Sequence, residues 1–262
     1  MALQRGASPW RVSVWTRSEA SLPAVRTALP GCRVSCDLKE AVEGVDLVVL
    51  CLSPQAIETS GDLLAGILPA SVPVTDAGSV KARIVASLEA ALGGRFIGAH
   101  PMAGSEQSRI AAARADLFDG ALCILTPTAD SDAGALDLVR RFWSDAGSRL
   151  CQMSPDDHDL AVARISHLPH ALAAVLVQAA LSNSPEIAGL AGSGFRDTTR
   201  VALGPEVLWK EILLDNREHL VTAIGELQAR LAALKQALIA GDSSEVETIL
   251  REARILREQP QP

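Results

Sequence analysis

The first half of the chain alternates short apolar runs with longer amphipathic stretches. Residues 46–52 (DLVVLCL) form a continuous apolar run, the pattern of a strand buried on both faces of a parallel sheet. Further apolar runs predict strands at 11–15, 72–77, 96–99, 121–126 and 149–153. Helical periodicity fills the intervals at 19–29, 56–67, 80–92 and 133–146. Strand–helix alternation is typical of a mostly parallel α/β sheet with right-handed crossovers.

The pattern changes at residue 153. Ser154-Pro155 followed by acidic residues is a helix-start signature, and apolar residues then recur at helical spacing. A second long helical pattern covers 206–240, a third closes the chain, and no strand pattern follows 153. We therefore predict an α/β domain at 1–153 and an all-helical domain at 154–262, both of ordinary domain size.

The last long helical pattern carries an apolar stripe. Large aliphatic residues recur at spacings of three and four: Leu220, Ile224, Leu227, Leu231, Leu234 and Leu238. The stripe either packs on other helices of the same chain or forms an interface in which helices of two chains interleave. The helices are long and apolar for so small a domain, which favours a homodimer.

Composition restricts the partners and the compartment. A net charge of −7 argues against sequence-independent nucleic-acid binding, which requires the neutralisation of phosphates. The longest apolar stretch, Leu168–Leu181, is interrupted by polar residues and is shorter than the roughly 20 residues of a membrane span. No signal-peptide pattern opens the chain, and the 5 cysteines are scattered without a CxxC pair. We expect a cytoplasmic protein with reduced thiols that binds neither nucleic acid nor membranes.

Four polar clusters stand out from this pattern. They are DAGSVK at 76–81, HPMAG at 100–104, SHLPH at 166–170 and GFRDTTR at 194–200. The first two follow predicted strands, and ligands of α/β sheets bind at the carboxyl ends of strands. His167 and His170 lie one helical turn apart, but no carboxylate or thiol completes a ligand set, so we predict no metal.

At these residues the chain resembles the prephenate/arogenate dehydrogenase family. The matching stretches are, in order, DAGSVK, GAHPMAG followed by Ser105-Glu106, ALCILTPT, HDLAVARISHLPH, GFRDTTR and LWKEILLDNRE. The resemblance covers Trp10 to about Leu238 and implies a Rossmann-like domain followed by a helical dimerisation domain. It implies oxidative decarboxylation of a cyclohexadienyl acid, prephenate or arogenate, with hydride transfer to a nicotinamide cofactor in tyrosine biosynthesis.

The resemblance also assigns catalytic residues. His100 matches the histidine that accepts the proton of the ring hydroxyl; alternatively, it only caps a strand end before Pro101. Ser79 matches the serine that hydrogen-bonds near the same hydroxyl and the nicotinamide; alternatively or in addition, it is the N-cap of the following helix.

Three further residues are implied to bind the substrate. Arg200 matches the arginine that holds a substrate carboxylate, for which a guanidinium fork is well suited. His170 is expected to approach the substrate side chain, and its donating or cationic group favours prephenate over arogenate. Trp209 is either a pocket wall or a core residue, and His167 is expected to be structural.

One motif of the family is missing. A GxGxxG turn normally follows the first strand and lays the pyrophosphate on a helix N-terminus. Here MALQRG resembles the end of the first helix and Trp10–Trp15 resembles the second strand, so roughly 15–20 residues of the standard plan are not in the sequence. The alternatives are a start codon assigned too late and a degenerate, non-catalytic homologue.

The residues after the second strand bear on the choice of cofactor. NAD-specific folds carry Asp or Glu there, whereas this chain has Thr16, Arg17 and Ser18. Arg17 and Ser18 can bind a 2′-phosphate; alternatively, Arg17 is only an exposed turn residue. We therefore expect NADP in preference to NAD. Ser53 and Pro54, after the strand at 46–52, are further cofactor-binding candidates together with Ser79.

Two other functions compete with this interpretation. A dehydrogenase of the β-hydroxyacid type would place a catalytic lysine in the helical domain, but Lys210 and Lys235 lie on long polar helix faces. A non-catalytic dimer would bind a cyclohexadienyl or aromatic ligand as a sensor, an alternative that the missing glycine-rich turn keeps open. The DNA upstream of Met1 distinguishes the enzyme from the sensor: an in-frame strand and GxGxxG turn would restore the enzyme, and an in-frame stop would favour the sensor.

Overall fold

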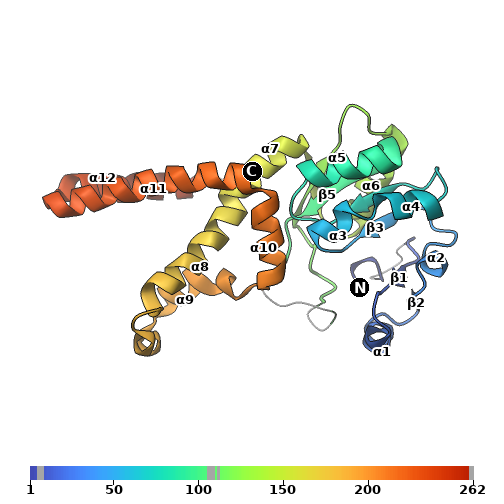
Figure 1. Cartoon of the computed structure of the whole chain (residues 1–262), viewed down its shortest axis with the longest axis horizontal. Helices are drawn as coiled ribbons and strands as arrows, with labels where there is room; N and C mark the ends of the chain where they lie inside the picture. Colours follow the sequence, from blue (N-terminus) through green and yellow to red (C-terminus); the bar gives the residue numbers. More distant parts are fainter. Residues whose placement is uncertain (5–8, 105–109, 111–112, 260–262) are drawn as a thin grey trace. The chain divides into compact units, whose positions relative to one another are not determined.

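A computed structural model describes residues 1–4, 9–104, 110 and 113–259 of the chain. The chain forms two compact units, Met1–Asn216 and Arg217–Pro262, which are described separately. The first contains all the strands of the described residues and the helices that cover them, and the second is a helical hairpin (Figure 1).

Short strands build the sheet of the first unit. They are β1 (Ser13–Trp15), β2 (Arg33–Ser35), β3 (Val48–Leu50), β4 (Val74–Asp76), β5 (Phe96–Pro101), β6 (Leu122–Thr126) and β7 (Arg149–Gln152). The six runs predicted from apolar patterning all contain a strand. The strand that patterning missed is β2, whose sequence Arg-Val-Ser offers one apolar residue and no alternation. Pairing with β1, and not local pattern, makes this segment a strand.

The strands form two separate sheets among the described residues. One has the order β1-β2 and the other the order β3-β4-β5-β6-β7. All neighbours pair in parallel except β5 and β6, which are antiparallel with Gly98 opposite Thr126. The prediction of a mostly parallel α/β sheet is therefore confirmed.

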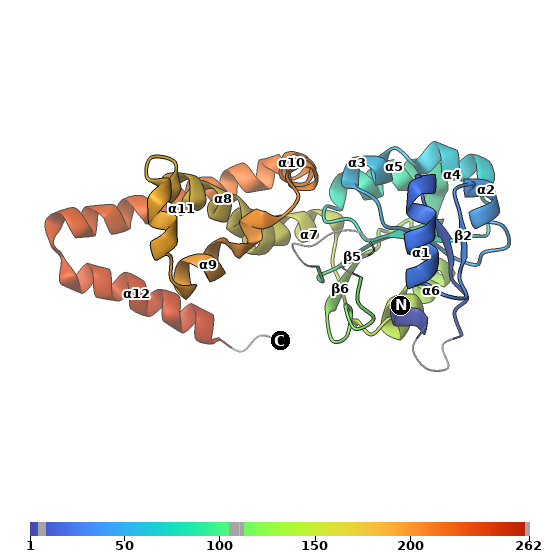
Figure 2. The same cartoon turned by 90° about the horizontal axis from the view of Figure 1, so that it is seen from below.

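Helices cover both faces of the larger sheet. They are α3 (Pro54–Glu58), α4 (Gly61–Ile67), α5 (Ala82–Leu92) and α6 (Ala133–Asp145), while α1 (Leu22–Ala28) and α2 (Leu38–Ala41) flank the smaller sheet. Along β5 successive residues face opposite sides: Phe96 packs in the core under α3–α5 and Ile97 in the core under α6. Figure 2 shows α5 and α6 on opposite sides of the strands.

The helix predicted at 56–67 is two helices. At the break, the Thr59 hydroxyl donates to the Gln55 carbonyl (2.9 Å) and the Ser60 hydroxyl to the Ile57 carbonyl (2.7 Å). Such local bonds compete with the helical ladder, which explains why α3 ends at Glu58.

A long helical run follows β7. It comprises α7 (Pro155–Val162), a π-helical turn (Ala163–His167) and α8 (Leu168–Leu181), and continues through α9 (Ser193–Thr199), the short 3₁₀ helix η7 (Arg200–Leu203) and α10 (Glu206–Asp215). Ser154 caps α7 by accepting a hydrogen bond from the Asp157 N–H (3.1 Å). The π turn ends two residues before Pro169, which has no N–H for the helical ladder.

The combined helix Pro155–Leu181 is longer than the apolar stretch considered from sequence. By length and composition its 27 residues, with a mean hydropathy of 1.6 over the best window, would suffice to cross a membrane. Core helices of soluble proteins pass the same test, so this finding is weak evidence for a membrane span. Several polar side chains of this helix, described below, are buried within the first unit.

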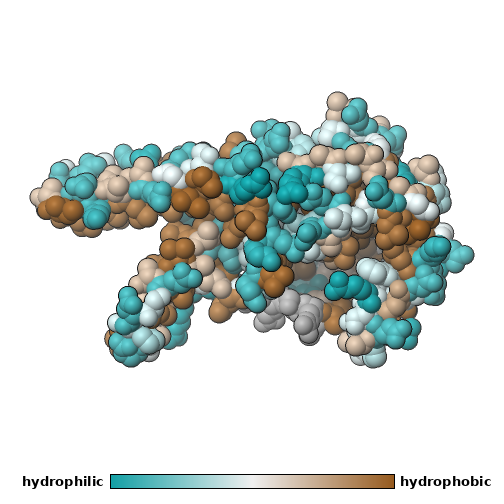
Figure 3. All heavy atoms as spheres, viewed as in Figure 1, coloured by the Kyte–Doolittle hydropathy of each residue, from teal (hydrophilic) through white to brown (hydrophobic). Residues whose placement is uncertain are grey.

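The second unit consists of α11 (Arg217–Ala240) and α12 (Ser243–Glu258), joined by a tight turn (Figure 2). Gly241 adopts a φ of +65°, which favours glycine, and the Asp242 carboxylate caps α12 at the Glu245 N–H (3.0 Å). In the predicted stripe, Leu231 and Leu238 are 52% and 62% exposed. Figure 3 shows hydrophobic and hydrophilic side chains mixed over this hairpin.

The helix predicted at 206–240 is interrupted between α10 and α11.

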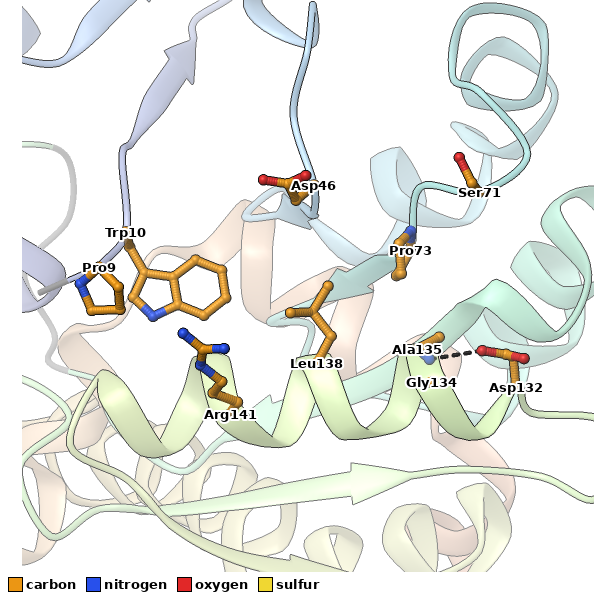
Figure 4. A pocket seen from close by; sticks show the side chains of 10 residues that line it. All are labelled: Pro9, Trp10, Asp46, Ser71, Pro73, Asp132, Gly134, Ala135, Leu138 and Arg141. Carbon is orange, nitrogen blue, oxygen red and sulfur yellow. Dashed lines mark hydrogen bonds between the residues drawn. The ribbon is translucent and has the colours of Figure 1, made fainter.

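The two sheets of the first unit are separated by a cavity of about 600 Å³ (Figure 4). Its walls are the amino-terminal approaches of β1, β3 and β4 together with α6; the lining residues are Pro9, Trp10, Asp46, Ser71, Pro73, Asp132, Gly134, Ala135, Leu138 and Arg141. Trp10 donates from its indole N–H to Asp145 (2.8 Å), and the Arg141 guanidinium lies 5.7 Å from its ring. In the standard doubly wound order a central strand occupies this place between β1 and β3.

Candidate active site

A buried ion pair fixes the floor of the site. Lys81, directly before α5, donates from Nζ to the Asp76 carboxylate at the end of β4 and to the Ala99 carbonyl (2.9 Å). Asp76 also accepts from the backbone N–H of Ala99 and of Gly78, each at 2.9 Å. Both charged side chains are completely buried, so these added hydrogen bonds offset part of their desolvation. The pair therefore clamps β5 at the residue before His100.

His100 lies on β5 and is 8% exposed. Its Nδ1 lies 2.8 Å from Nε2 of His158 on α7, and His158 Nδ1 lies 2.8 Å from Asp159 Oδ1. Burial lowers the pKa of His100 well below 6.5, and the nearby His158, Lys81 and His167 lower it further. His100 is therefore neutral at physiological pH, as a general base must be.

Asp159 joins this cluster to α5. Its carboxylate accepts hydrogen bonds from the backbone N–H of Lys81 (2.8 Å) and of Ala82 (2.9 Å), the first residue of α5. Burial alone would raise the pKa of Asp159, but the hydrogen bonds from His158 and from these two N–H groups outweigh it, and the pKa is lowered. Ser79 makes no capping bond to α5, so the alternative of Ser79 as the N-cap is wrong; Asp159 takes that place.

Ser79 is half-buried in the turn between β4 and α5. A side chain at the preceding Gly78 would put its Cβ 2.8 Å from Asp76 Oδ2 and 2.9 Å from Ile84 Cδ1, so the turn requires glycine there. The Ser79 backbone lies close enough to His167 to raise the pKa of that histidine, but burial is the larger effect and lowers it to about 4. Ser79 and His167 are thus brought together by β4 and the π turn.

His170 and Trp209 form a stacked pair. Their ring centroids are 3.5 Å apart with an interplanar angle of 12°, and His167 meets Trp209 edge-on at 6.2 Å. A Cβ at Gly204 would lie 2.6 Å from the Trp209 indole nitrogen, so the loop after η7 passes directly over the pair. Trp209 is half-buried and packs against the core under α3–α5, as expected of a core residue, while its role as a pocket wall stays a prediction.

Arg200 is the first residue of η7 and is exposed. Because η7 ends at Leu203, next to Gly204, the arginine lies on the short segment that leads to the His170–Trp209 stack.

The cofactor candidates lie at the carboxyl ends of two strands. Thr16, whose N–H donates to the Ser35 carbonyl (3.0 Å), leads from β1 into the exposed Arg17 and Ser18. Ser53 and Pro54 begin α3 after β3, and the N–H of Gln55 donates to Glu211 of α10 (3.3 Å), the helix that carries Trp209. The matched residues Ser105 and Glu106 lie outside the described residues.

These residues fit the two ends of a nicotinamide dinucleotide but not its middle. Ser53, Pro54 and Ser79 border the edge of the larger sheet at which His100 lies, and Thr16–Ser18 form a polar turn on the smaller sheet. Residues 1–262 contain no glycine-rich turn between the two to receive a pyrophosphate. Within the described ranges, no three His, Cys, Asp or Glu side chains are grouped to hold a metal ion.

Comparison with known proteins identifies the family. The model of the prephenate dehydrogenase nucleotide-binding domain matches residues 9–152, and that of the prephenate dehydrogenase dimerization domain matches residues 154–252. The chain belongs to the prephenate dehydrogenase family. It is therefore a nicotinamide-dependent oxidoreductase, as the resemblance of its motifs indicated.

Relatives support the assignment over nearly the whole chain. The chain is 34% identical to the cyclohexadienyl dehydrogenase of Zymomonas mobilis, over 88% of this chain and 80% of that protein. It superposes on Aquifex aeolicus prephenate dehydrogenase, in complex with hydroxyphenyl propionate and NAD⁺, with a TM-score of 0.90, 32% identity and coverage of 98% and 91%. The corresponding values for Synechocystis arogenate dehydrogenase are 0.78, 30%, 93% and 88%.

Sequence reasoning missed the residues that surround His100. His158 and Asp159 lie in the matching stretch HDLAVARISHLPH, but they were interpreted only as part of a helix start. Lys81 was noted only as part of the matching stretch DAGSVK. An adjacent His-Asp pair in the first turns of an apolar helix is a signal for a buried cluster, because such a pair is expensive to bury without partners. Asn216 gave no comparable signal, yet its side chain donates to the Asp159 carbonyl (2.7 Å).

Proposed function

We propose that this family member oxidatively decarboxylates prephenate, with arogenate as the alternative substrate, in tyrosine biosynthesis. The observation that carries the proposal is a buried, neutral His100 clamped at the carboxyl edge of the sheet, next to the turn that holds Ser79. The names of the Zymomonas, Aquifex and Synechocystis proteins support the substrate class.

In this proposal His100 moves the proton of the ring hydroxyl. A bound, oxidised nicotinamide would supply the acceptor for the hydride that leaves ring C4. His100 accepts the C4 hydroxyl proton as the C–O bond gains carbonyl character. The bond from C1 to the ring carboxylate then breaks, its electron pair enters the ring, and CO₂ leaves. His100 returns the proton to the resulting phenolate oxygen, so the histidine is unchanged after one turnover.

The other residues bind and orient the substrate. Ser79 hydrogen-bonds the C4 hydroxyl from the turn after β4, and Arg200 holds a carboxylate with its planar fork. The His170–Trp209 stack forms a flat, largely apolar wall for the ring, with an interplanar angle of 12°. We assign His170 to the substrate side chain, where a hydrogen-bond donor suits the pyruvyl group and favours prephenate.

We also propose NADP as the preferred cofactor, with NAD as the alternative. Arg17 and Ser18 are exposed at the carboxyl end of β1, where a 2′-phosphate would meet a guanidinium and not a carboxylate. Ser53, Pro54 and Ser79 would hold the nicotinamide end. The NAD⁺ in the Aquifex complex favours the alternative.

The domain and assembly assignments complete the proposal. We assign the nucleotide-binding domain to 1–153 and the helical domain to 154–262, with a homodimer formed through the helical domain. The description of the second family model as a dimerization domain supports the dimer. We also assign the protein to the cytoplasm, an assignment with which free cysteines are compatible, and the net charge of −7 disfavours nucleic acid. Exposed apolar residues of α8 face a second copy in this proposal, and not lipid.

A matrix of two substrates and two cofactors tests the function. Prephenate and arogenate are each incubated with the protein and with saturating NADP or NAD, and reduced nicotinamide and CO₂ are measured together. Equal amounts of both products, with prephenate and NADP the best pair, are expected. Binding of prephenate without turnover in any arm would favour the sensor, and turnover of a β-hydroxyacid without CO₂ would favour the other dehydrogenase type.

A further inference from the structure

A chain of hydrogen bonds runs from Asp159 through His158 to His100. The two links, Asp159 Oδ1 to His158 Nδ1 and His158 Nε2 to His100 Nδ1, are both 2.8 Å. All three residues are less than 9% exposed, so water does not substitute for either link. Each imidazole nitrogen in the chain must therefore act as donor or acceptor in a fixed way.

The direction of the chain follows from its carboxylate end. Asp159 already accepts two backbone N–H groups, and its low pKa keeps it ionised, so it only accepts. His158 must then donate from Nδ1. Burial lowers the pKa of His158, so this ring is neutral at physiological pH and its Nε2 carries a lone pair. His100 must donate to that lone pair from Nδ1, which leaves its own Nε2 unprotonated.

We propose that His158 and Asp159 are positioning residues that hold His100 as the Nδ1–H tautomer, with the Nε2 lone pair free to accept the substrate proton. The proposal rests on the function proposed above and adds two residues to the site. The opposite tautomer, with hydrogen on Nε2, would present a donor to the C4 hydroxyl and would not accept its proton.

Asp159, at the carboxylate end of this hydrogen-bond chain (the relay), is held in place by several further hydrogen bonds. Asp159 binds the start of α5 with both carboxylate oxygens, at 2.8 and 2.9 Å, and its carbonyl accepts from Asn216 (2.7 Å). The same Asn216 amide lies 3.1 Å from His167 Nδ1. Rotation of Asp159 would break the cap of α5 as well as the relay, so the orientation of His158 is coupled to the fold itself.

The relay also stabilises the positive charge that forms on His100 during the reaction. When Nε2 of His100 takes a proton, its Nδ1–H donates more strongly to His158, and the Asp159 carboxylate lies at the far end of the chain. Burial opposes this charge, and His158, Lys81 and His167 lower the pKa of His100 further, while the Asp76 carboxylate is bound by Lys81. Asp159 is thus the carboxylate that acts on His100 through hydrogen bonds.

The tautomer is measurable directly. The chain has 5 histidines, so ¹⁵N-histidine labelling gives a small set of imidazole signals, and His100→Asn and His158→Gln assign the two of interest. Near neutral pH, His100 should carry hydrogen on Nδ1 and His158 on Nδ1. A wild-type spectrum with hydrogen on Nε2 of His100 would overturn the proposal. This measurement does not depend on turnover, so it tests the relay even if the proposed reaction is wrong.

Matched substitutions test the consequence for catalysis. His158→Gln retains a carbonyl acceptor for His100 and should keep kcat within about 10-fold. His158→Leu removes the acceptor and should lower kcat by about 100-fold or more, with KM changed only a few-fold and a mixed tautomer at His100. His219→Leu, in the second unit, is the control and should change neither. Unchanged kcat in His158→Leu would contradict the proposal; if that variant fails to fold, Asp159→Asn and the wild-type tautomer decide.

Asp159→Asn should reverse the relay. An amide nitrogen in place of Asp159 Oδ1 can donate to His158 Nδ1, but only with loss of the hydrogen bond that Oδ1 accepts from the Lys81 N–H. In that orientation the hydrogen of His158 would move to Nε2, and that of His100 to Nε2 as well. The expected result is a loss of kcat of about 100-fold or more, together with hydrogen on Nε2 in the His100 signal. Loss of activity with the Nδ1–H tautomer retained would contradict the proposal and assign Asp159 only to the capping of α5.

Discussion

Burial sets the charge of every histidine that surrounds the site. The pKa values of His100, His158, His167 and His170 are all lowered, with burial the largest cause in each case. His100 is consequently a base at physiological pH. His170 is neutral as well, so it offers the substrate side chain a hydrogen bond but no positive charge. The recognition of carboxylates therefore falls to Arg200, in the proposed site.

Replacement of His100 tests the general base. His100→Asn should lower kcat by roughly 10²–10⁴-fold, because it removes the proton acceptor while the Asn amide can still donate to His158. Thermal unfolding and cofactor titration should be nearly unchanged, which separates loss of chemistry from loss of structure. A kcat within a few-fold of the unsubstituted protein would show that His100 only ends β5.

Replacement of Arg200 tests the carboxylate site. Arg200→Lys keeps the charge but loses the bidentate fork, so KM for prephenate should rise by about 10-fold or more while cofactor affinity stays constant. Steady-state kinetics with either ligand varied gives both quantities. Weaker NADP binding with an unchanged KM for prephenate would instead place Arg200 at the cofactor.

The low pKa of His167 predicts how stability depends on pH. Its pKa in the fold is about 4, against 6.5 for the free side chain, so below about pH 6.5 the unfolded chain binds a proton that the folded protein does not. The contribution of His167 to the free energy of unfolding is therefore complete above about pH 6.5. Between about pH 6.5 and about pH 4, the free energy of unfolding should decrease by about 1.4 kcal/mol for each pH unit. Urea unfolding across this range should show a smaller slope for His167→Gln. An identical slope would mean that His167 is not neutral in the fold.

At the scale of elements, helices and strands with long apolar patterns could be predicted from the sequence. Elements that depend on a short pairing or on a few polar hydrogen bonds could not. The strands β3 and β5 and the helices α5 and α6 follow from apolar periodicity, because burial of whole faces dominates their stability. The strand β2 and the break at Thr59 depend on one partner strand and on two side-chain hydrogen bonds. In the candidate site, His100 and Ser79 were expected from their places at the carboxyl ends of predicted strands, and His100 in fact lies within β5. The link to His158 joins residues 58 positions apart and has no local signal.

The exposed face of α8 predicts a dimer interface. Leu172 and Val175, with Ile165 in the π turn, are 39%, 59% and 67% exposed, and their spacing puts them on one side of the helix. Val175→Glu should raise the dissociation constant of the dimer by about 10-fold or more, because a charge would be buried without a partner. Light scattering over a dilution series measures the change. Leu63→Glu, at a residue that is 57% exposed on α4, is the control and should leave the dimer intact. An unaffected dimer in Val175→Glu would place the interface elsewhere.

At the scale of the whole molecule, the division of the sheet is the feature with the largest consequence. Among described residues β1 pairs only with β2, and β3 pairs on one side with β4, so two strand edges border the cavity near Trp10. Strand edges without partners leave backbone N–H and C=O groups to water and weaken the connection between the halves of the sheet. The dinucleotide ends proposed above lie on different sheets, which makes cofactor affinity depend on how well these sheets are joined.

An engineered extension tests this dependence. Adding an apolar strand and a GxGxxG turn before Met1 should fill the place between β1 and β3, raise the melting temperature and supply backbone N–H groups for the pyrophosphate. We expect the extended protein to bind NADP at least about 10-fold more tightly than the 262-residue chain, since the proposed contacts of Arg17 and Ser79 would hold only the ends of the cofactor. Calorimetric titration of both forms at matched concentration measures the difference in affinity. The control is an extension in which alanine replaces the glycines, because it restores the strand but not the close approach of the backbone to phosphate. Micromolar NADP binding by the 262-residue chain would contradict the prediction and would mean that another segment already provides the phosphate site.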